Sequence, residues 1–146
     1  MRTIAVPIQL INLNEDGFHL LVEITAFGSK HLAVVDTGAS RTVFDKRFVE
    51  EHSQEVTTDT DNAATTLFST SATIQALLPK LKIGKLKIED YTTVGLDLET
   101  VNDAYALLGH PRVIAILGSD LLYLYQAKIN YKKLKIIFSK NPLKPF

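Results

Sequence analysis

The stretch Val34–Phe44, VVDTGASRTVF, decides the fold of this chain. Two valines lead into Asp36, and the tetrapeptide Thr-Gly-Ala-Ser follows at once. This pattern predicts a buried strand that ends on a carboxylate and then turns. Because an unpaired buried carboxylate is costly, we expect Asp36 to do more than end a strand. The simpler alternative is a turn aspartate that bonds to its own backbone loop.

A second apolar stretch lies downstream at residues 113–122, VIAILGSDLL. It is continuous up to Gly118 rather than alternating, which predicts a strand that is buried on both faces. Ser119 follows and is expected to cap a short helix over residues 120–125. Asp120 is expected to form a local cap or ion pair, with orientation of a functional site as the alternative.

Most of the remaining chain consists of short alternating segments bounded by turn residues, which predicts an all-β fold. Pro7 suggests an edge or bulge in the first strand, and Pro79 is expected to end a later one. The polar residues 54–71 are expected to form an extended, mobile hairpin. The lysines around Gly84 indicate a sheet face that is exposed to solvent. The expected strands are residues 3–13, 18–27, 30–35, 74–78, 81–90 (two strands and a turn), 127–130 and 134–138.

Two further segments are expected to be helical. Asp45 stands where an N-cap would begin a short helix through Glu51. Residues 98–108 carry Val101, Tyr105 and Leu108 at helical spacing, and Gly109 follows as a C-cap glycine.

Length and composition indicate one domain over residues 1–146, with no special affinity for charged partners. The chain has 146 residues, and its 16 basic and 16 acidic side chains balance. We therefore expect no nucleic-acid partner and no membrane partner. There is no cysteine, and no window approaches membrane-spanning length. A soluble, cytoplasmic protein is expected, although a signal removed from the sequence stays open.

Other catalytic chemistries find no support in the sequence. The histidines His19, His31, His52 and His110 show neither a pairing four residues apart nor a carboxylate at ligand spacing. No G-x-S-x-G motif and no phosphate-binding loop occur. The sequence therefore predicts neither a metal site nor a serine hydrolase.

Taken together, the two apolar motifs resemble those of the retropepsin-like aspartic proteases, the single-domain relatives of pepsin and of retroviral proteases. The matching residues are VVDTGAS at 34–40 and IAILGSD at 114–120. The likeness runs from about Phe18 to Phe138, and its closing strands are similar to those of bacterial and retrotransposon-type members. It implies an all-β, closed acid-protease barrel with one or two short helices.

The resemblance also implies roles for individual residues. Asp36 would be the catalytic carboxylate, and the Thr37 hydroxyl would brace the loop against its partner loop. Gly38 would let the backbone approach its neighbour without a Cβ. Ala39 and Ser40 would line the floor of the groove.

The second motif would support the first from behind. Ile116, Leu117 and Gly118 would thread through the loop behind the aspartate and fix its position. A rigid strand there would also give the buried polar backbone its partners.

Catalysis by this family needs two carboxylates that share one proton, and this chain has a single Asp-Thr-Gly. The resemblance therefore implies a homodimer in which Asp36 meets its symmetry mate. The substrate would be an extended peptide or protein segment, and no metal, cofactor or covalent intermediate would be needed. Two alternatives remain: a non-catalytic, peptide-binding dimerisation module, and a chain that another protein completes.

The sequence departs from the retroviral pattern in two places. The expected flap region, residues 59–74, contains no glycine. Ser40 and Ser119 stand where retroviral members often carry an Asp–Arg ion pair. Flap closure and dimer stabilisation are therefore expected to differ from those of retroviral enzymes.

Overall fold

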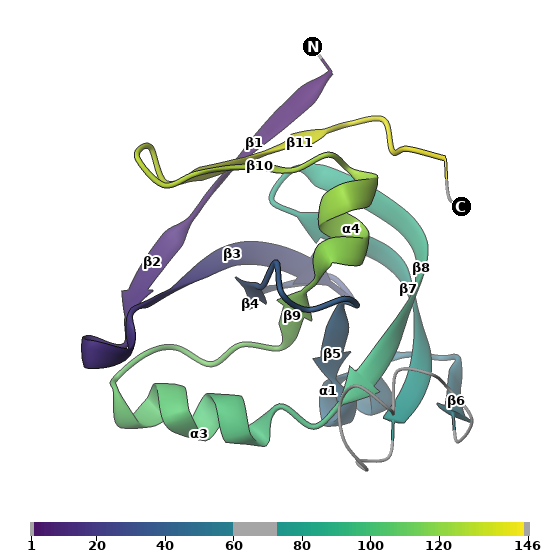
Figure 1. Ribbon diagram of the computed structural model, residues 1–146. Helices are drawn as coiled ribbons and strands as arrows, with labels where there is room; N and C mark the ends of the chain where they lie inside the picture. The colour runs from purple at the N-terminus through teal and green to yellow at the C-terminus, as the bar shows by residue number, and fades with distance from the viewer. Residues whose placement is uncertain (1, 60–72, 145–146) are drawn as a thin grey trace.

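The computed structural model describes residues 2–59 and 73–144 (Figure 1). The strands are β1 Thr3–Pro7, β2 Gln9–Asn12, β3 Phe18–Ala26, β4 Ser29–Val35, β5 Val43–Asp45, β6 Val56–Asp59, β7 Thr73–Ile83, β8 Leu86–Leu96, β9 Ala115–Leu117, β10 Lys128–Asn130 and β11 Lys135–Ser139. The helices are α1 Lys46–His52, α3 Glu99–Leu107, α4 Ser119–Leu124 and the 3-10 helix η1 Asn14–Asp16.

The larger sheet closes into a barrel. Its strand order is β2-β3-β4-β9-β5-β8-β7-β6, and β3 pairs a second time, with β7. The ring β3-β4-β9-β5-β8-β7 is therefore complete, with the pair Ile24↔Ile83 among those that close it. This confirms the expected mostly β, closed-barrel fold. Within the ring β9 lies parallel to β4 and antiparallel to β5.

The first predicted strand is two strands in two different sheets. β1 pairs with β11 in a three-stranded sheet, whereas β2 pairs with β3 of the barrel. The change of partner falls at Ile8, which is buried and donates its N–H to the Leu134 carbonyl at 2.9 Å. Pro7, which has no N–H for a ladder, is the last residue of β1, so its position agrees with its chemistry.

Pro79 does not end a strand, contrary to the expectation. β7 runs through it to Ile83, because ladder pairs on both sides, Leu78↔Tyr91 and Lys80↔Glu89, hold the strand in place. Across from Pro79, Asp90 adopts a positive φ of 53°. The backbone adjusts at this one step, and the long β7–β8 hairpin continues past it.

The apolar side chains form one main core and two smaller clusters. The main core fills the barrel and includes Leu20, Val35 and Phe44. A second cluster, with Leu21 and Val34 among its members, lies under Tyr105 of α3. Neighbouring residues of β3 and β4 thus face opposite clusters, which explains why these strands are apolar on both faces.

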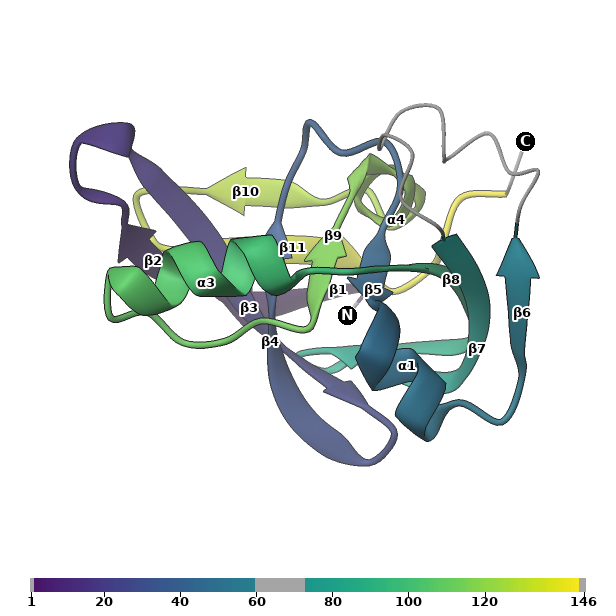
Figure 2. The same ribbon diagram turned by 90° about the horizontal axis from the view of Figure 1, so that it is seen from below.

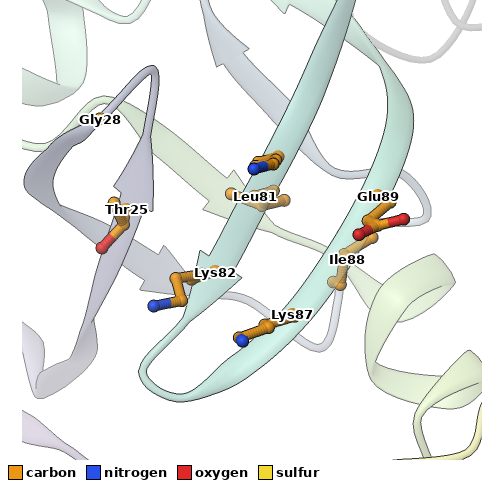
Figure 3. Close-up of a pocket in the computed structure, with 8 residues that line it drawn as sticks. Thr25, Gly28, Leu81, Lys82, Lys87, Ile88 and Glu89 are labelled. Carbon is orange, nitrogen blue, oxygen red and sulfur yellow. The ribbon is translucent and has the colours of Figure 1, made fainter.

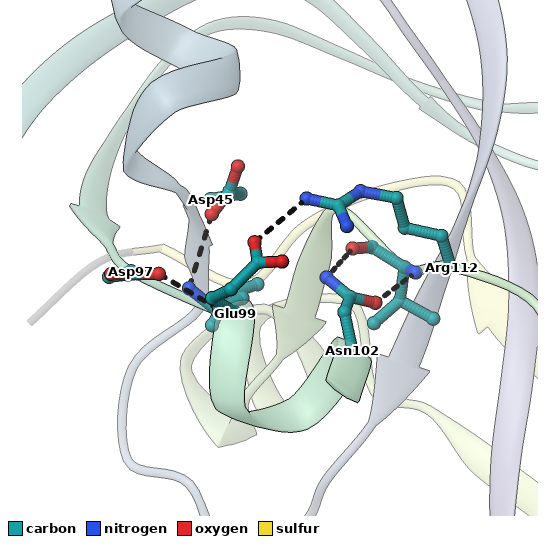
Figure 4. Close-up of polar contacts among 7 residues, drawn as sticks. Asp45, Asp97, Glu99, Asn102 and Arg112 are labelled. Carbon is teal, nitrogen blue, oxygen red and sulfur yellow. Dashed lines mark hydrogen bonds and ion pairs between the residues drawn. The ribbon is translucent and has the colours of Figure 1, made fainter. Parts of the chain in front are cut away.

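The start of α1 differs from the prediction. Asp45 precedes the helix, but its side chain makes no cap hydrogen bond to it. Its Oδ1 accepts the N–H of Leu98 at 3.1 Å instead, as Figure 4 shows. Asp45 therefore joins β5 to the beginning of α3.

The other two helices also refine the predictions. Ser119 is the first residue of α4 and not its cap, a position that Gly118 takes. α3 ends at Leu107, and Leu108 beyond it is 39 % exposed, so Leu108 does not pack as the spacing predicted. Gly109 has a φ of 75°, which confirms its predicted place at the helix end. In the described part of the chain, no helix is long and apolar enough to cross a membrane.

Candidate active site

Asp36 is the first residue after β4, on a loop that spans residues 36–42. Its N–H donates to the Leu117 carbonyl at 2.9 Å, which extends the pairing of β4 with β9 beyond Val35↔Leu117. Val35 is 7 % exposed, whereas Asp36 is exposed in the single chain. In the single chain, burial therefore ends one residue before the carboxylate, which emerges on the loop, and its burial in a homodimer stays a prediction.

A tight turn fixes the orientation of the Asp36 carboxylate. Its Oδ1 accepts the Gly38 N–H at 2.9 Å, and its carbonyl accepts the Ala39 N–H at 3.2 Å. A Cβ at Gly38 would lie 3.3 Å from Asp36 Oδ1, so any larger residue would crowd the carboxylate. This is the geometry of the simple turn aspartate, here formed on a loop that other elements support from behind.

Gly118 allows the loop to lie directly against the end of β9. A Cβ at this position would stand 2.7 Å from the Arg41 carbonyl carbon and oxygen and 2.8 Å from the Ala39 oxygen. The next residue, Ser119, donates its N–H to the same Ala39 oxygen at 2.7 Å. Only glycine fits between these backbones, and the contact holds the middle of the loop.

A chain of hydrogen bonds fixes the far end of the loop. Gly118 N–H donates to Thr42 Oγ1 at 2.9 Å, and Thr42 Oγ1 donates to Asp120 Oδ1 at 2.8 Å. The Thr42 N–H also reaches Asp120 Oδ1, at 2.9 Å. Tyr91 of β8 donates to Asp120 Oδ2 at 3.2 Å, and burial, with the charge of Asp120 second, raises the pKa of Tyr91. Asp120 thus orients the loop, which was the alternative for this residue.

The sequence reasoning missed Thr42 and Tyr91. Thr42 lies within the quoted stretch, two residues after Ser40, and is 1 % exposed, so a threonine next to the apolar pair Val43 and Phe44 was the available signal. No local pattern pointed to Tyr91, because its partner Asp120 is 29 positions away.

The structure brings the predicted site residues together. The loop residues 36–40 lie beside Ile116, Leu117 and Gly118, with Leu117 buried and Ile116 half-buried. Thr37 and Ser40 are exposed and Ala39 is half-buried. Ser40 and Ser119 share the lining of a depression of about 540 Å³ with Asp120, Tyr123, Leu124, Leu143 and Lys144. The bracing role of Thr37 concerns a partner loop and stays a prediction.

Tyr105 of α3 lies close enough to interact electrostatically with Asp36. Its side chain is 3 % exposed, and its hydroxyl is 2.7 Å from His19 Nδ1. Burial, and after it the negative charge of Asp36, raise the pKa of Tyr105 to about 12. The phenol is therefore neutral throughout the range in which proteases work.

A second concave surface lies apart from these residues, on the β7–β8 hairpin (Figure 3). Its volume is about 320 Å³, and its lining includes Thr25 and the cross-strand pair Lys82↔Lys87. None of the predicted site residues lines it. Of the lysines around Gly84, Lys85 and Lys87 are exposed, as the solvated-face interpretation predicts, whereas Lys82 is half-buried.

Two other predictions concern the flap and a metal site. Most of the expected flap, residues 59–74, lies outside the described residues. Within residues 2–59 and 73–144, no group of His, Asp or Glu side chains is arranged to hold a metal ion.

Comparisons with known proteins agree with this geometry. Residues 22–121, which include Asp36 and Gly118, match a family model described as aspartyl protease. A retropepsin-like aspartic protease from Rickettsia conorii has a TM-score of 0.53 at 22 % identity, over 93 % of this chain and 89 % of that one. The retroviral protease-like domain of Ddi1 from Leishmania major has a TM-score of 0.53 at 16 % identity, over 86 % and 98 %. These two structures show a shared fold, and a search of curated proteins finds no match.

Proposed function

The chain belongs to the aspartyl protease family, and from this premise we propose that it is an endopeptidase whose catalytic dyad forms between two copies of Asp36. One chain supplies one Asp-Thr-Gly, so the proposal requires a homodimer. The substrate would be an extended peptide or protein segment held in the groove by backbone hydrogen bonds and side-chain pockets.

The proposed mechanism is general acid–base catalysis on water. Two carboxylates at close range cannot both ionise comfortably, so the pair holds one proton between them. The ionised member removes a proton from water, and the protonated member polarises the scissile carbonyl. The other residues of the site hold the Asp36 carboxylate in position: the Gly38 N–H fixes its orientation, and Gly118 and Thr42 fix the loop that carries it.

One observation supports this proposal most directly. The Asp36 carboxylate is exposed, yet its loop is fixed by backbone contacts from β9 and by the Thr42–Asp120 hydrogen bonds. A surface carboxylate without a function needs no such support. A catalytic one does, because small displacements of a reacting group reduce the rate strongly.

Asp36→Asn tests the proposal. We expect wild type to cleave members of a peptide library near pH 5, and the variant to lose about 10²–10⁴-fold of that rate, the usual contribution of acid–base catalysis. Asp16→Asn, the same change on an exposed turn, is the matched control and should cleave normally. Equal cleavage by the Asp36 variant would refute the dyad.

The shared proton also predicts a dependence on pH. Activity should be highest at acidic to mildly acidic pH, because the dyad loses its one proton as pH rises. Initial rates on one peptide between pH 4 and pH 9 would measure this. A flat profile would contradict the mechanism.

The alternative function is a peptide-binding dimerisation module of the same fold. It would bind library peptides without cleaving them in either wild type or Asp36→Asn. The cytoplasmic location, and the absence of nucleic-acid and membrane partners, stay predictions from the sequence.

A further inference from the structure

Two side chains beside Asp36, His19 of β3 and Tyr105 of α3, have no role in the mechanism above. We propose that they form a polar subsite of the substrate groove, in which His19 Nε2 donates a hydrogen bond to a substrate side chain that carries an amide or carboxyl oxygen. The inference rests on the proposed function and specifies the substrate class.

The register of β3 and β4 places His19 beside Asp36. The last pair of this ladder is Leu20↔Val35, so the next position along both strands sets His19 across from Asp36. Side chains two residues apart on a strand share a face. Asp36 therefore shares the face of Val34, and His19 shares the face of Leu21.

That face is the one α3 covers. Val34 and Leu21 pack in the same cluster as Tyr105, outside the barrel. The Tyr105 hydroxyl meets His19 Nδ1 at 2.7 Å, and the two rings lie 5.8 Å apart between centroids. His19 itself is exposed, so a buried tyrosine holds a surface imidazole beside the candidate catalytic carboxylate.

The helix that carries Tyr105 is firmly attached. Asn102, 5 % exposed, donates Nδ2–H to the Val113 carbonyl at 3.0 Å and accepts the Val113 N–H at 2.8 Å, as Figure 4 shows. At the start of α3, Leu98 N–H donates to Asp45. Tyr105 is therefore fixed to β5 and to the segment that leads into β9, and its hydroxyl has a defined position before substrate binds.

The hydrogen bond between Tyr105 and His19 determines whether His19 Nε2 carries a proton that it can donate to a substrate. The Tyr105 phenol keeps its proton, because burial and the charge of Asp36 both oppose its loss. When that proton is donated to Nδ1, the imidazole carries its own proton on Nε2. Nε2 points away from Nδ1 and from Tyr105. An imidazole with both nitrogens protonated also has an Nε2–H, and only the neutral tautomer that donates from Nδ1 to Tyr105 lacks it, so the proposal assigns Tyr105 as the donor.

A donor that is oriented in advance favours a matching acceptor. Little conformational freedom is lost when a substrate oxygen meets it, whereas an aliphatic side chain leaves the donor without a partner in the complex. The difference for one such hydrogen bond is about tenfold in kcat/KM.

The test uses peptide pairs that carry either Gln or Met, which are nearly equal in size, at each position next to the scissile bond. The measured quantity is the ratio of kcat/KM for the two peptides. Wild type should prefer Gln about tenfold at one position. His19→Leu should bring this ratio close to one, and His19→Gln, which keeps a donor near the place of Nε2, should largely restore it. Tyr105→Phe should lower the ratio, because the imidazole loses its fixed orientation.

General damage to the fold lowers cleavage of both peptides alike and leaves the ratio unchanged. His31→Leu, which changes a histidine at the other end of the β3–β4 hairpin, is the matched control and should keep the wild-type ratio. A wild-type ratio near one at every position, or a ratio that His19→Leu leaves intact, would overturn the proposal.

The subsite is also testable without catalysis. Calorimetry with Asp36→Asn, alone and combined with His19→Leu, measures binding of the same Gln and Met peptides. A Gln preference that disappears with His19→Leu supports the subsite even if wild type cleaves nothing, in which case only the enzymatic proposal fails. Equal binding of the two peptides, or no binding of either, refutes the subsite.

Discussion

At Gly118 the separation between two backbone segments decides which residue the position accepts. The site geometry depends on such single positions: Gly38 leaves room for the Asp36 carboxylate, and Gly118 leaves room for the Arg41 and Ala39 carbonyls. At Gly118 the neighbours are backbone atoms that cannot move aside, so no larger residue fits, whereas a Cβ at Gly38 would require the Asp36 carboxylate to shift. Tyr105 is the opposite case, a large buried side chain whose hydroxyl meets His19 and whose pKa is raised by burial and then by the charge of Asp36.

Gly118→Ala is expected to displace the loop. The added Cβ would stand 2.7 Å from backbone atoms, which cannot move as the end of a side chain can. We expect a loss of about 1–3 kcal/mol in the free energy of unfolding, measured in urea, and a larger proportional loss of cleavage. Gly109→Ala, where a Cβ meets nothing within 4 Å but φ is 75°, is the control and should lose stability alone.

The raised pKa of Tyr105 predicts that the folded chain loses stability at alkaline pH. Its pKa is raised from 10.0 to about 12 in the folded chain, so its contribution is fully present below pH 10 and disappears as pH rises toward 12. Urea unfolding between pH 8 and pH 11 should show a smaller decline for Tyr105→Phe than for wild type. Tyr131→Phe, on a side chain that is 65 % exposed, should decline as wild type does. Parallel curves for all three proteins would contradict the assignment.

At the scale of elements, the loop after β4 is held by its neighbours in the fold. β9 supplies the backbone partner of Asp36, α4 supplies Asp120, and β8 supplies Tyr91. Thr42 is the point where these meet, since its hydroxyl accepts from Gly118 and donates to Asp120. Loss of that hydroxyl would leave a buried backbone N–H without a partner.

Thr42→Val removes the hydroxyl and keeps the shape. We expect a loss of about 1–3 kcal/mol in the free energy of unfolding, the usual cost of a buried polar group without its partner. Cleavage should fall as well, because the Asp36 loop then keeps only its backbone contacts to α4, from the Thr42 N–H to Asp120 and from the Ser119 N–H to Ala39. Thr92→Val, the same change on an exposed residue of β8, should alter neither. Normal stability and activity in Thr42→Val would show that the hydrogen-bond chain is dispensable.

Much of this arrangement could be predicted from the sequence, because local patterns carry it. The sequence predicted the turn at Gly38, the role of the glycine after Leu117, and the strands through their alternating apolar residues. Local patterns could not show which residues, distant in the sequence, form the hydrogen bonds of a given position. Ile8 looks like the middle of one strand, and only the distant Leu134 reveals the change of sheet. Asp45 looks like an N-cap, and only Leu98, 53 positions away, reveals its actual partner.

At the scale of the whole molecule, the closed barrel leaves the Asp36 loop exposed on the single chain. The barrel ring is complete without a second copy, and the terminal strands β1 and β11 pair within the chain (Figure 2). The fold therefore has its own core and sheets as a monomer. The proposed dyad needs a second carboxylate, and the chain has a single Asp-Thr-Gly, so we expect association to control activity more than folding.

Mixing experiments test this expectation. Excess Asp36→Asn added to wild type should remove cleavage, because most wild-type chains would then pair with a chain that cannot supply the second carboxylate. An equal amount of additional wild-type chain is the control and should raise the rate. Wild-type activity that persists at high excess of the variant would show that a single chain is sufficient, or that the subunits do not exchange.

The parallel contact between the two motifs has a consequence for biosynthesis. Thr42 and its hydrogen-bond donor Gly118 are 76 positions apart, and β9, which lies behind Asp36, comes after most of the barrel in chain order. Contacts of such long sequence separation form late in folding. A nascent chain on the ribosome therefore carries the Asp36 loop without its support until Gly118 has emerged. Under the proposed function, competence for proteolysis would then arise only after Gly118 has emerged, which would protect the preceding part of the growing chain and its neighbours from premature cleavage.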